Sequence, residues 1–244
     1  MIDGVVVITG GTRGIGLAAA RRLAARGIPL VLGYRGDAEA AASAETELAS
    51  LTEVRAVQSD VGTDEGAAAL FEAADGVGAM AGLVNSAGVL ERQSRFVDID
   101  LARWRRVFET NVLGTVRCCR EAVPRMAGAG GGAIVNVSSR AAVLGSPDEY
   151  VDYAASKAAV DTLTRGLALE VAGSGIRVNS VRPGIIDTDI HASGGEPGRV
   201  GRLAPSLPMR RGGSADEVAA AIEWLLSSEA SYVTGTTVDV SGGR

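Results

Sequence analysis

Short runs of β-branched and other aliphatic residues recur along the chain, and each is bounded by Gly, Pro, Asp or Asn. Such runs predict β-strands at residues 5–9, 30–34, 54–58, 82–85, 133–138, 177–181 and 236–240. Segments rich in Ala and Leu with helical periodicity lie between them, at residues 15–26, 39–51, 65–75, 101–126, 153–172 and 215–226. The strict alternation of strands and helices predicts parallel βαβ units with right-handed crossovers.

The first predicted strand is apolar without interruption from Val5 to Ile8, as expected for a sheet that helices cover on both faces. We therefore expect an α/β fold: a Rossmann-type, doubly wound parallel sheet of about seven strands with helices on both faces. Residues 1–244 are expected to form a single domain. In such sheets ligands bind beyond the carboxyl ends of the strands, so the candidate chemistry should lie there.

Two segments interrupt the alternation. Residues 128–132 are rich in glycine and predict a turn facing solvent. Residues 187–213 hold many Gly and Pro residues and the only histidine, His191, and a loop of that length predicts a lid over a functional site. We expect His191 to face solvent from this lid, and the alternative is a hydrogen bond to substrate.

Composition limits the partners. Of the 244 residues, 46% are hydrophobic and 22% charged, which is enough for a large core, and the net charge is −5 without any basic run. That balance argues against nucleic acid or an anionic membrane and favours a small molecule. The neighbouring Cys118 and Cys119 predict packing positions and no disulfide framework. Without a signal sequence or a membrane span we expect a cytoplasmic protein, and we predict no metal site.

A glycine-rich turn follows the first predicted strand and opens the first predicted helix. It contains Gly10, Gly14 and Gly16, in the spacing Gly-x-x-x-Gly-x-Gly. This spacing departs from the common Gly-x-Gly-x-x-Gly fingerprint. The strand, turn and helix context nevertheless predicts a dinucleotide site, because glycines let the backbone approach a pyrophosphate at the helix N-terminus.

The end of the second predicted strand bears on the choice of nicotinamide cofactor. Tyr34 ends that strand and Arg35 follows it, so Arg35 and Arg13 of the glycine turn could flank a 2′-phosphate. Asp37 argues for the alternative, because a carboxylate about 20 residues past Gly16 is typical of NAD-binding proteins. We expect NADP, with NAD possible.

Tyr153 and Lys157 are four residues apart in a predicted helix, so both side chains project from the same face. A phenol has a pKa of about 10 and exchanges protons poorly at neutral pH. A nearby ammonium favours the phenolate, so we expect Lys157 to lower the pKa of Tyr153. The pair predicts a site of proton transfer.

Together these motifs resemble one family across nearly the whole chain, the short-chain dehydrogenases/reductases of about 250 residues, including the 3-oxoacyl-carrier-protein reductases and glucose 1-dehydrogenases. Asn85-Ser86-Ala87-Gly88 is similar to the family's Asn-Asn-Ala-Gly signature, with Ser86 in place of the second Asn. The resemblance implies a catalytic tetrad of Asn111, Ser139, Tyr153 and Lys157. It also implies the cofactor-binding residues Gly10, Thr12, Arg13, Gly14, Ile15, Gly16, Tyr34, Arg35, Asp60, Val61, Asn85, Ala87, Gly88, Tyr153, Lys157, Pro183, Gly184, Ile186 and Thr188.

The catalytic serine has two candidates. Ser139 lies fourteen residues before Tyr153, where the family usually has thirteen, so Ser138 competes with Ser139. We favour Ser139, because the turn at residues 145–150 can absorb one residue. Tyr150 is an alternative proton donor, but no lysine follows it four residues later.

The resemblance implies NADP(H)-dependent interconversion of a carbonyl compound and an alcohol, with Asn111 holding a water that links Lys157 to solvent. The alternative is a redox-silent nucleotide sensor on the same fold. Leu144, Gly145, Tyr150 and Ile190 are expected in the wall of the substrate pocket. A homotetramer is implied, with a dimer as the alternative.

Overall fold

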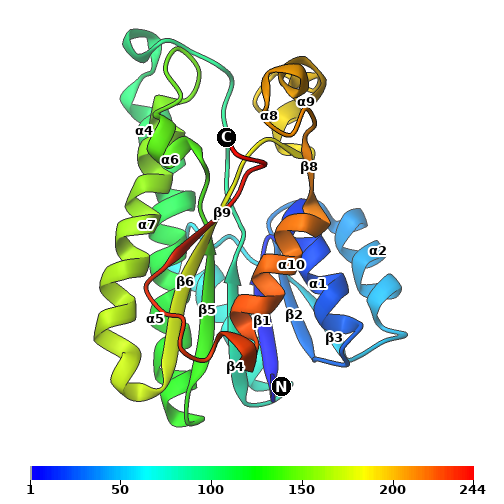
Figure 1. Cartoon of the computed structure of the whole chain (residues 1–244). Helices are drawn as coiled ribbons and strands as arrows, with labels where there is room; N and C mark the ends of the chain where they lie inside the picture. Colours follow the sequence, from blue (N-terminus) through cyan, green and yellow to red (C-terminus); the bar gives the residue numbers. More distant parts are fainter. Residues whose placement is uncertain (1) are drawn as a thin grey trace.

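Seven parallel strands form the central sheet of the computed structural model, which describes residues 2–244 (Figure 1). They are β1 (Val5–Thr9), β2 (Leu30–Tyr34), β3 (Val54–Gln58), β4 (Met80–Asn85), β5 (Gly132–Val137), β6 (Ile176–Pro183) and β9 (Thr237–Val240). The strand order is β3-β2-β1-β4-β5-β6-β9, and each neighbouring pair is parallel. The order therefore reverses beside β1, and the predicted doubly wound sheet is confirmed.

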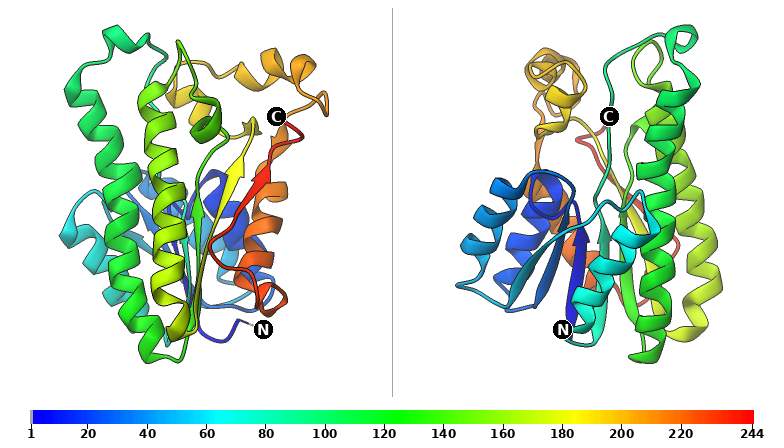
Figure 2. Two further views of the ribbon diagram at one scale, coloured as in Figure 1. Left: turned by 60° about the vertical axis from the view of Figure 1, so that its left-hand side comes forward. Right: turned by 180° about the vertical axis from the view of Figure 1, so that it is seen from behind.

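Helices cover both faces of this sheet (Figures 1 and 2). One face is covered by α1 (Gly14–Ala24), α2 (Ala38–Leu48) and α10 (Ala215–Leu226), and the other by α3 (Asp64–Asp75), α5 (Gly114–Gly128) and α7 (Val151–Val171). Side chains of β1 alternate between the two layers, so Val6 and Ile8 pack in the first and Val5 and Val7 in the second. Such burial on both faces explains the uninterrupted apolar run.

The prediction of one continuous helix at residues 101–126 is wrong in detail. The chain instead forms α4 (Leu101–Phe108), a π-helical segment (Glu109–Leu113) and then α5. A π-turn inserts one extra residue per turn and often marks a functional position. Here the segment contains Asn111, whose buried side chain bonds to two other parts of the chain. Long-range bonds of this kind leave no periodic signal in the sequence.

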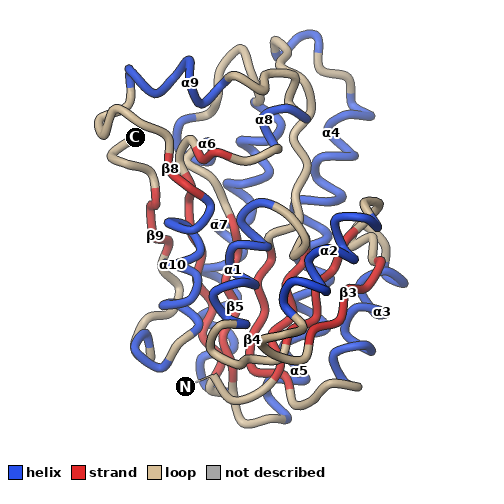
Figure 3. Tube along the Cα trace, turned by 90° about the vertical axis from the view of Figure 1, so that its right-hand side faces the viewer, coloured by secondary structure: helices blue, strands red, loops and turns tan. Residues whose placement is uncertain are grey.

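The segment predicted as a lid contains short helices: α8 (Ile190–Ser193), α9 (Arg199–Leu203) and a 3₁₀ turn (Ala204–Ser206). Its two ends are joined by a small parallel pair, β7 (Ile186–Asp187) with β8 (Gly213–Ser214). Figure 3 shows α8 and α9 beyond the carboxyl edge of the main sheet, on the same side as α6 (Ala141–Leu144). The segment therefore stands over the edge where a ligand is expected.

A buried ion pair joins α4 to the first turn of α7. Arg103 Nε and Nη2 donate to the two carboxylate oxygens of Asp152 at 2.7 and 3.0 Å. The third arm of the guanidinium donates to the Arg92 carbonyl at 2.6 Å. The side chains of Arg103 and Asp152 are 9% and 0% exposed, so water cannot solvate either charge if its partner is removed. The pair fixes the start of α7 immediately before Tyr153.

Removing one partner of this ion pair should lower the free energy of unfolding more than removing both partners. We predict that Arg103→Met lowers the free energy of unfolding by about 3–5 kcal/mol, because it leaves the Asp152 carboxylate buried and uncompensated. The double variant Arg103→Met/Asp152→Leu should recover a large part of that loss. Urea unfolding monitored by circular dichroism measures both, and a single variant within about 1 kcal/mol of the wild type would contradict this account.

Candidate active site

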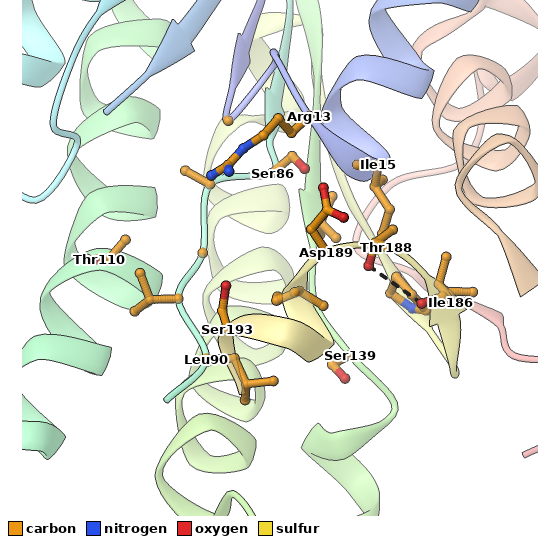
Figure 4. Close-up of a pocket in the computed structure, with 18 of the residues that line it drawn as sticks. Arg13, Ile15, Ser86, Leu90, Thr110, Ser139, Ile186, Thr188, Asp189 and Ser193 are labelled. Carbon is orange, nitrogen blue, oxygen red and sulfur yellow. Dashed lines mark hydrogen bonds between the residues drawn. The ribbon is translucent and has the colours of Figure 1, made fainter. Parts of the chain in front are cut away.

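A cavity of about 790 Å³ opens at the carboxyl edge of the sheet, beneath the lid segment. Its volume lies in the range of small-molecule and cofactor pockets, about 300–1,000 Å³. Figure 4 shows Arg13 and Ile15 of the glycine turn at one end of the site and Ser139 and Leu90 at the other. The cavity therefore connects the predicted cofactor site to the predicted catalytic serine.

The glycine turn has the backbone shape that a pyrophosphate requires. Gly10 and Gly14 have positive φ angles of 61° and 51°. A Cβ at Gly16 would lie 2.2 Å from the Gly10 carbonyl oxygen, so only glycine fits there. Helix α1 begins at Gly14, and no side chain caps its N-terminus, which leaves its first N–H groups available to an anion. These residues fit a dinucleotide.

The end of the cavity where we expect the adenosine is lined by Tyr34, Arg35, Asp37, Asp60 and Val61. The Asp37 carboxylate accepts a hydrogen bond from the Ala40 N–H at 3.0 Å and thereby caps α2. It also lies 3.4 Å from Arg13 Nη1. Asp37 is therefore engaged by protein groups, whereas no ion-pair partner of Arg35 is found within residues 2–244.

Helix α7 presents Tyr153 and Lys157 to the cavity, and Ser139, beyond the end of β5, reaches the same space. Lys157 Nζ lies 5.6 Å from the centroid of the Tyr153 ring. It donates a hydrogen bond to the Val137 carbonyl at 2.8 Å, and the side chain is buried. The spacing of four residues thus places both groups on one face of the helix, as predicted.

Burial governs the proton affinities of this pair. It lowers the pKa of Lys157 to about 8, while the Asp161 carboxylate opposes the change. Burial raises the pKa of Tyr153 to about 12, and the Ser139 hydroxyl opposes that change. The expectation that Lys157 lowers the pKa of Tyr153 is therefore wrong for the ligand-free protein. The Lys157 ammonium faces the Tyr153 ring and donates to the Val137 carbonyl.

The two serine candidates have different surroundings. Ser138 is 2% exposed and donates its hydroxyl to the Lys157 carbonyl at 3.2 Å, which ties β5 to α7. Both serines line the cavity, but the Ser139 hydroxyl accepts a hydrogen bond, from the Ala141 N–H at 3.1 Å. A serine that accepts this bond keeps its own proton for a ligand. The geometry favours Ser139 over Ser138.

Asn111 lies behind the cavity wall. Its amide nitrogen donates to the Val89 carbonyl at 3.1 Å and to Ser156 Oγ at 3.0 Å, and its oxygen accepts the Val89 N–H at 2.8 Å. The side chain thus holds the loop after β4 against α7. Whether Asn111 also holds a water beside Lys157 stays a prediction.

Most of the remaining predicted residues line the cavity. They are Gly10, Thr12, Ala87, Gly88, Pro183, Gly184, Ile186 and Thr188, with Leu144, Tyr150 and Ile190 of the predicted wall. Gly16, Asn85 and Gly145 do not line it. Gly16 acts through close packing, and Asn85 donates to Asn136 Oδ1 at 2.9 Å inside the sheet.

His191 does not face solvent, which corrects the expectation. It is 8% exposed, because α8 folds it against β7, where its Nε2 lies 2.9 Å from the Ile186 carbonyl. Burial lowers its pKa, so the ring is neutral near pH 7. The lid thus contributes a buried imidazole to the wall of the cavity.

Sequence reasoning missed Arg140, Arg199 and Arg244, which also line the cavity. Each comes from a different segment, and each reaches the cavity only through tertiary folding. No spacing rule identifies such residues. Among residues 2–244, no group of three or more His, Cys, Asp or Glu side chains is arranged to hold a metal ion, and no helix has the length and apolarity to cross a membrane.

Comparison with known proteins shows the family of this chain. A family model described as enoyl-(acyl carrier protein) reductase matches residues 10–244. The chain belongs to the short-chain dehydrogenase/reductase family. It is an NAD(P)-dependent oxidoreductase that acts on CH–OH and C=O groups of small molecules.

Relatives match over nearly the full length. The uncharacterized oxidoreductase YgfF of Escherichia coli (strain K12) is 51% identical over 98% of this chain and 99% of its own. The 3beta-hydroxysteroid dehydrogenase 1 of Eggerthella lenta is 40% identical over 98% and 92%. The crystal structure of levodione reductase superposes with a TM-score of 0.92 at 33% identity, covering 100% of this chain and 98% of that one.

The depressed pKa of Lys157 can be measured directly, because the sequence contains no other lysine. We predict a single ¹⁵N-lysine side-chain resonance in the ligand-free protein that titrates with a pKa near 8. Burial penalises the ammonium, so the proton is lost as the pH rises through this value. Lys157→Arg should remove the resonance. Titration near 10.4, the value of a free lysine, would contradict the burial argument.

Proposed function

We propose that the protein interconverts a ketone or aldehyde and an alcohol with NADP(H), using Asn111, Ser139, Tyr153 and Lys157. The observation that carries this proposal is that Ser139, Tyr153 and Lys157 line the same cavity as the glycine turn. The groups that would hold the dinucleotide and those that would move the proton therefore share one continuous space.

Each side chain has a defined part in the reaction. When bound, the nicotinamide supplies or accepts a hydride at the reacting carbon. Tyr153 donates a proton to the carbonyl oxygen in reduction and removes it from the alcohol in oxidation. The Ser139 hydroxyl donates a hydrogen bond to that oxygen as negative charge develops on it.

Lys157 and Asn111 support Tyr153. A lysine ammonium has three N–H donors, and the Val137 carbonyl accepts one, which leaves two for ribose hydroxyls and for the proton path to Tyr153. Asn111 hydrogen-bonds to Val89 and Ser156 and so holds the loop after β4, which forms part of the cavity wall, against α7.

The preference for NADP rests on the arginines of the adenosine end. Arg35 lines the cavity without an ion-pair partner within the described residues, so its guanidinium is available to a 2′-phosphate. Asp37 is occupied by the α2 cap and by Arg13, which weakens it as an acceptor for a ribose 2′-hydroxyl. Arginine matches a phosphate through two parallel hydrogen bonds.

We also propose that the protein assembles into a homotetramer. Phe96 and Val97, in a 3₁₀ turn before α4, are 62% and 78% exposed, and Leu101, the first residue of α4, is 71% exposed. Leu169, near the end of α7, is 78% exposed. Exposed apolar side chains gathered at one place, as around Phe96, Val97 and Leu101, are typical of contacts between protein chains. A second copy of the chain would cover them.

The proton-transfer role is tested by Tyr153→Phe. We predict that this variant loses about 10²–10⁴-fold in kcat on a panel of ketones assayed with NADPH, because it removes only the acidic proton. NADPH binding, followed by fluorescence titration, should stay within about threefold of the wild type. Tyr232→Phe is the control, since Tyr232 is fully exposed.

Retained wild-type turnover in Tyr153→Phe would refute this assignment. A wild-type protein that binds NADPH tightly but reduces nothing in a broad panel would instead favour the redox-silent sensor.

The cofactor preference is tested by Arg35→Ala. We predict that it raises the KM for NADPH by about 10–100-fold, the cost of losing hydrogen bonds to a charged group. The KM for NADH should change by less than about twofold, since NADH carries no 2′-phosphate. Steady-state kinetics with both cofactors measures this, and a tenfold preference of the wild type for NADH would overturn the proposal.

A further inference from the structure

Three guanidinium groups line the part of the cavity that faces the lid, those of Arg140, Arg199 and Arg244. They come from the segment after β5, from α9 and from the tail after β9. Figures 1 and 2 show this tail ending between α6 and the lid helices. The remaining walls here include apolar side chains such as Leu90 and Leu144.

Carboxylates neutralise two of the three. Arg199 pairs with Glu149 at 2.5 Å and with Glu196 at 3.1 Å. Arg140 pairs with Asp239 at 2.6 Å. The pairs of Arg199 tie α9 to Glu149, before α7, and to Glu196, and the pair of Arg140 ties the segment after β5 to β9.

Arg244 differs from both. Among residues 2–244, no Asp or Glu carboxylate lies within ion-pair distance of its guanidinium, and Glu149, already paired with Arg199, acts on it only from farther away. Its side chain is partly buried, and burial, followed by repulsion from Arg199, lowers its pKa from the ordinary value. An arginine nevertheless keeps its charge in proteins. An unpaired charge that is partly withdrawn from water favours an anionic partner.

The nearby acid of the lid does not serve as that partner. Asp189 lines the cavity, but Figure 4 shows it beside Thr188 on the side of Ile15, toward the glycine turn. The groups that interact with Arg244 are Arg199, Glu149 and Arg140, all at the lid end. Arg244 therefore belongs to the substrate end and lies apart from the phosphate-binding turn.

The tail that carries Arg244 is held in place. The Arg244 N–H donates to the Ser241 carbonyl, and the Ser241 hydroxyl donates to the Arg244 carbonyl, both at 3.2 Å. Gly242 and Gly243 have positive φ angles of 60° and 87°, which turn the chain back. A Cβ at Gly184 would lie 2.8 Å from Ser241 Cα, so the tail also packs closely on the segment after β6. The guanidinium is presented from a fixed backbone.

We propose that Arg244 binds a carboxylate of the substrate, so that the protein acts on oxo acids and hydroxy acids whose carboxylate is remote from the reacting carbon. The inference rests on the proposed function, because it concerns the substrate end of the same cavity. A single guanidinium matches a carboxylate through two parallel hydrogen bonds. The apolar walls would hold the hydrocarbon between the carboxylate and the carbonyl group near Ser139 and Tyr153.

Binding tests the proposal without requiring turnover. Straight-chain oxo acids of five to ten carbons, and the primary amide of each, are titrated by calorimetry into protein saturated with NADP⁺, which cannot reduce them. We expect at least one oxo acid to bind about tenfold or more tightly than its amide. Arg244→Gln should abolish this preference and Arg244→Lys should keep part of it. Arg55→Gln, which removes an exposed arginine paired with Glu53, should leave it unchanged.

Several results would overturn the proposal: equal binding of every acid and its amide to the wild type, or a preference that survives in Arg244→Gln. A change in subunit assembly of Arg244→Gln in sedimentation would assign the residue to a contact between copies and also overturn it. Turnover with NADPH separates the two proposals. Reduction of amides and acids alike would leave the proposed function standing and refute the role of Arg244. If oxo acids bind through Arg244 but none is reduced, the role of Arg244 stands and the proposed function is refuted.

Discussion

The reversal of strand order beside β1 is the constraint on which the site depends. Strands β2 and β3 lie on one side of β1, and β4 and β5 lie on the other. The connections leaving β1 and β4 therefore diverge to opposite faces, and the carboxyl edge between them stays open. A helix N-terminus, a glycine turn and the loop after β4 meet at this opening. Only glycine fits at position 16, where α1 passes within contact of the Gly10 carbonyl.

Burial then determines the chemistry that this opening can support. Lys157 is placed behind the Tyr153 ring, where loss of water lowers the pKa of its ammonium. The same loss raises the pKa of the phenol. The site thus holds a neutral phenol beside an ammonium that loses its proton more readily than a free lysine, and the Val137 carbonyl accepts one of the three N–H donors of that ammonium. A cofactor that supplies hydroxyl groups would be a partner for the other two.

Features that depend on local sequence patterns could be predicted from the sequence. Apolar runs gave the seven strands, and the spacing of Tyr153 and Lys157 gave their common helix face. The sequence did not predict the π-segment at Asn111, the burial of His191, or the ion pair of Arg103 with Asp152. These features depend on contacts between residues far apart in the chain, which leave no periodic pattern. Residues 187–213 were expected to form a long loop, and their short helices were not expected.

We propose that one cavity aligns a dinucleotide with Tyr153 and Lys157. A crystal structure of the complex with NADP⁺ tests it most directly. We expect the pyrophosphate against the N–H groups at Gly14, the 2′-phosphate between Arg13 and Arg35, and the nicotinamide beside Tyr153. A dinucleotide bound elsewhere, or a nicotinamide turned away from Tyr153, would contradict the account.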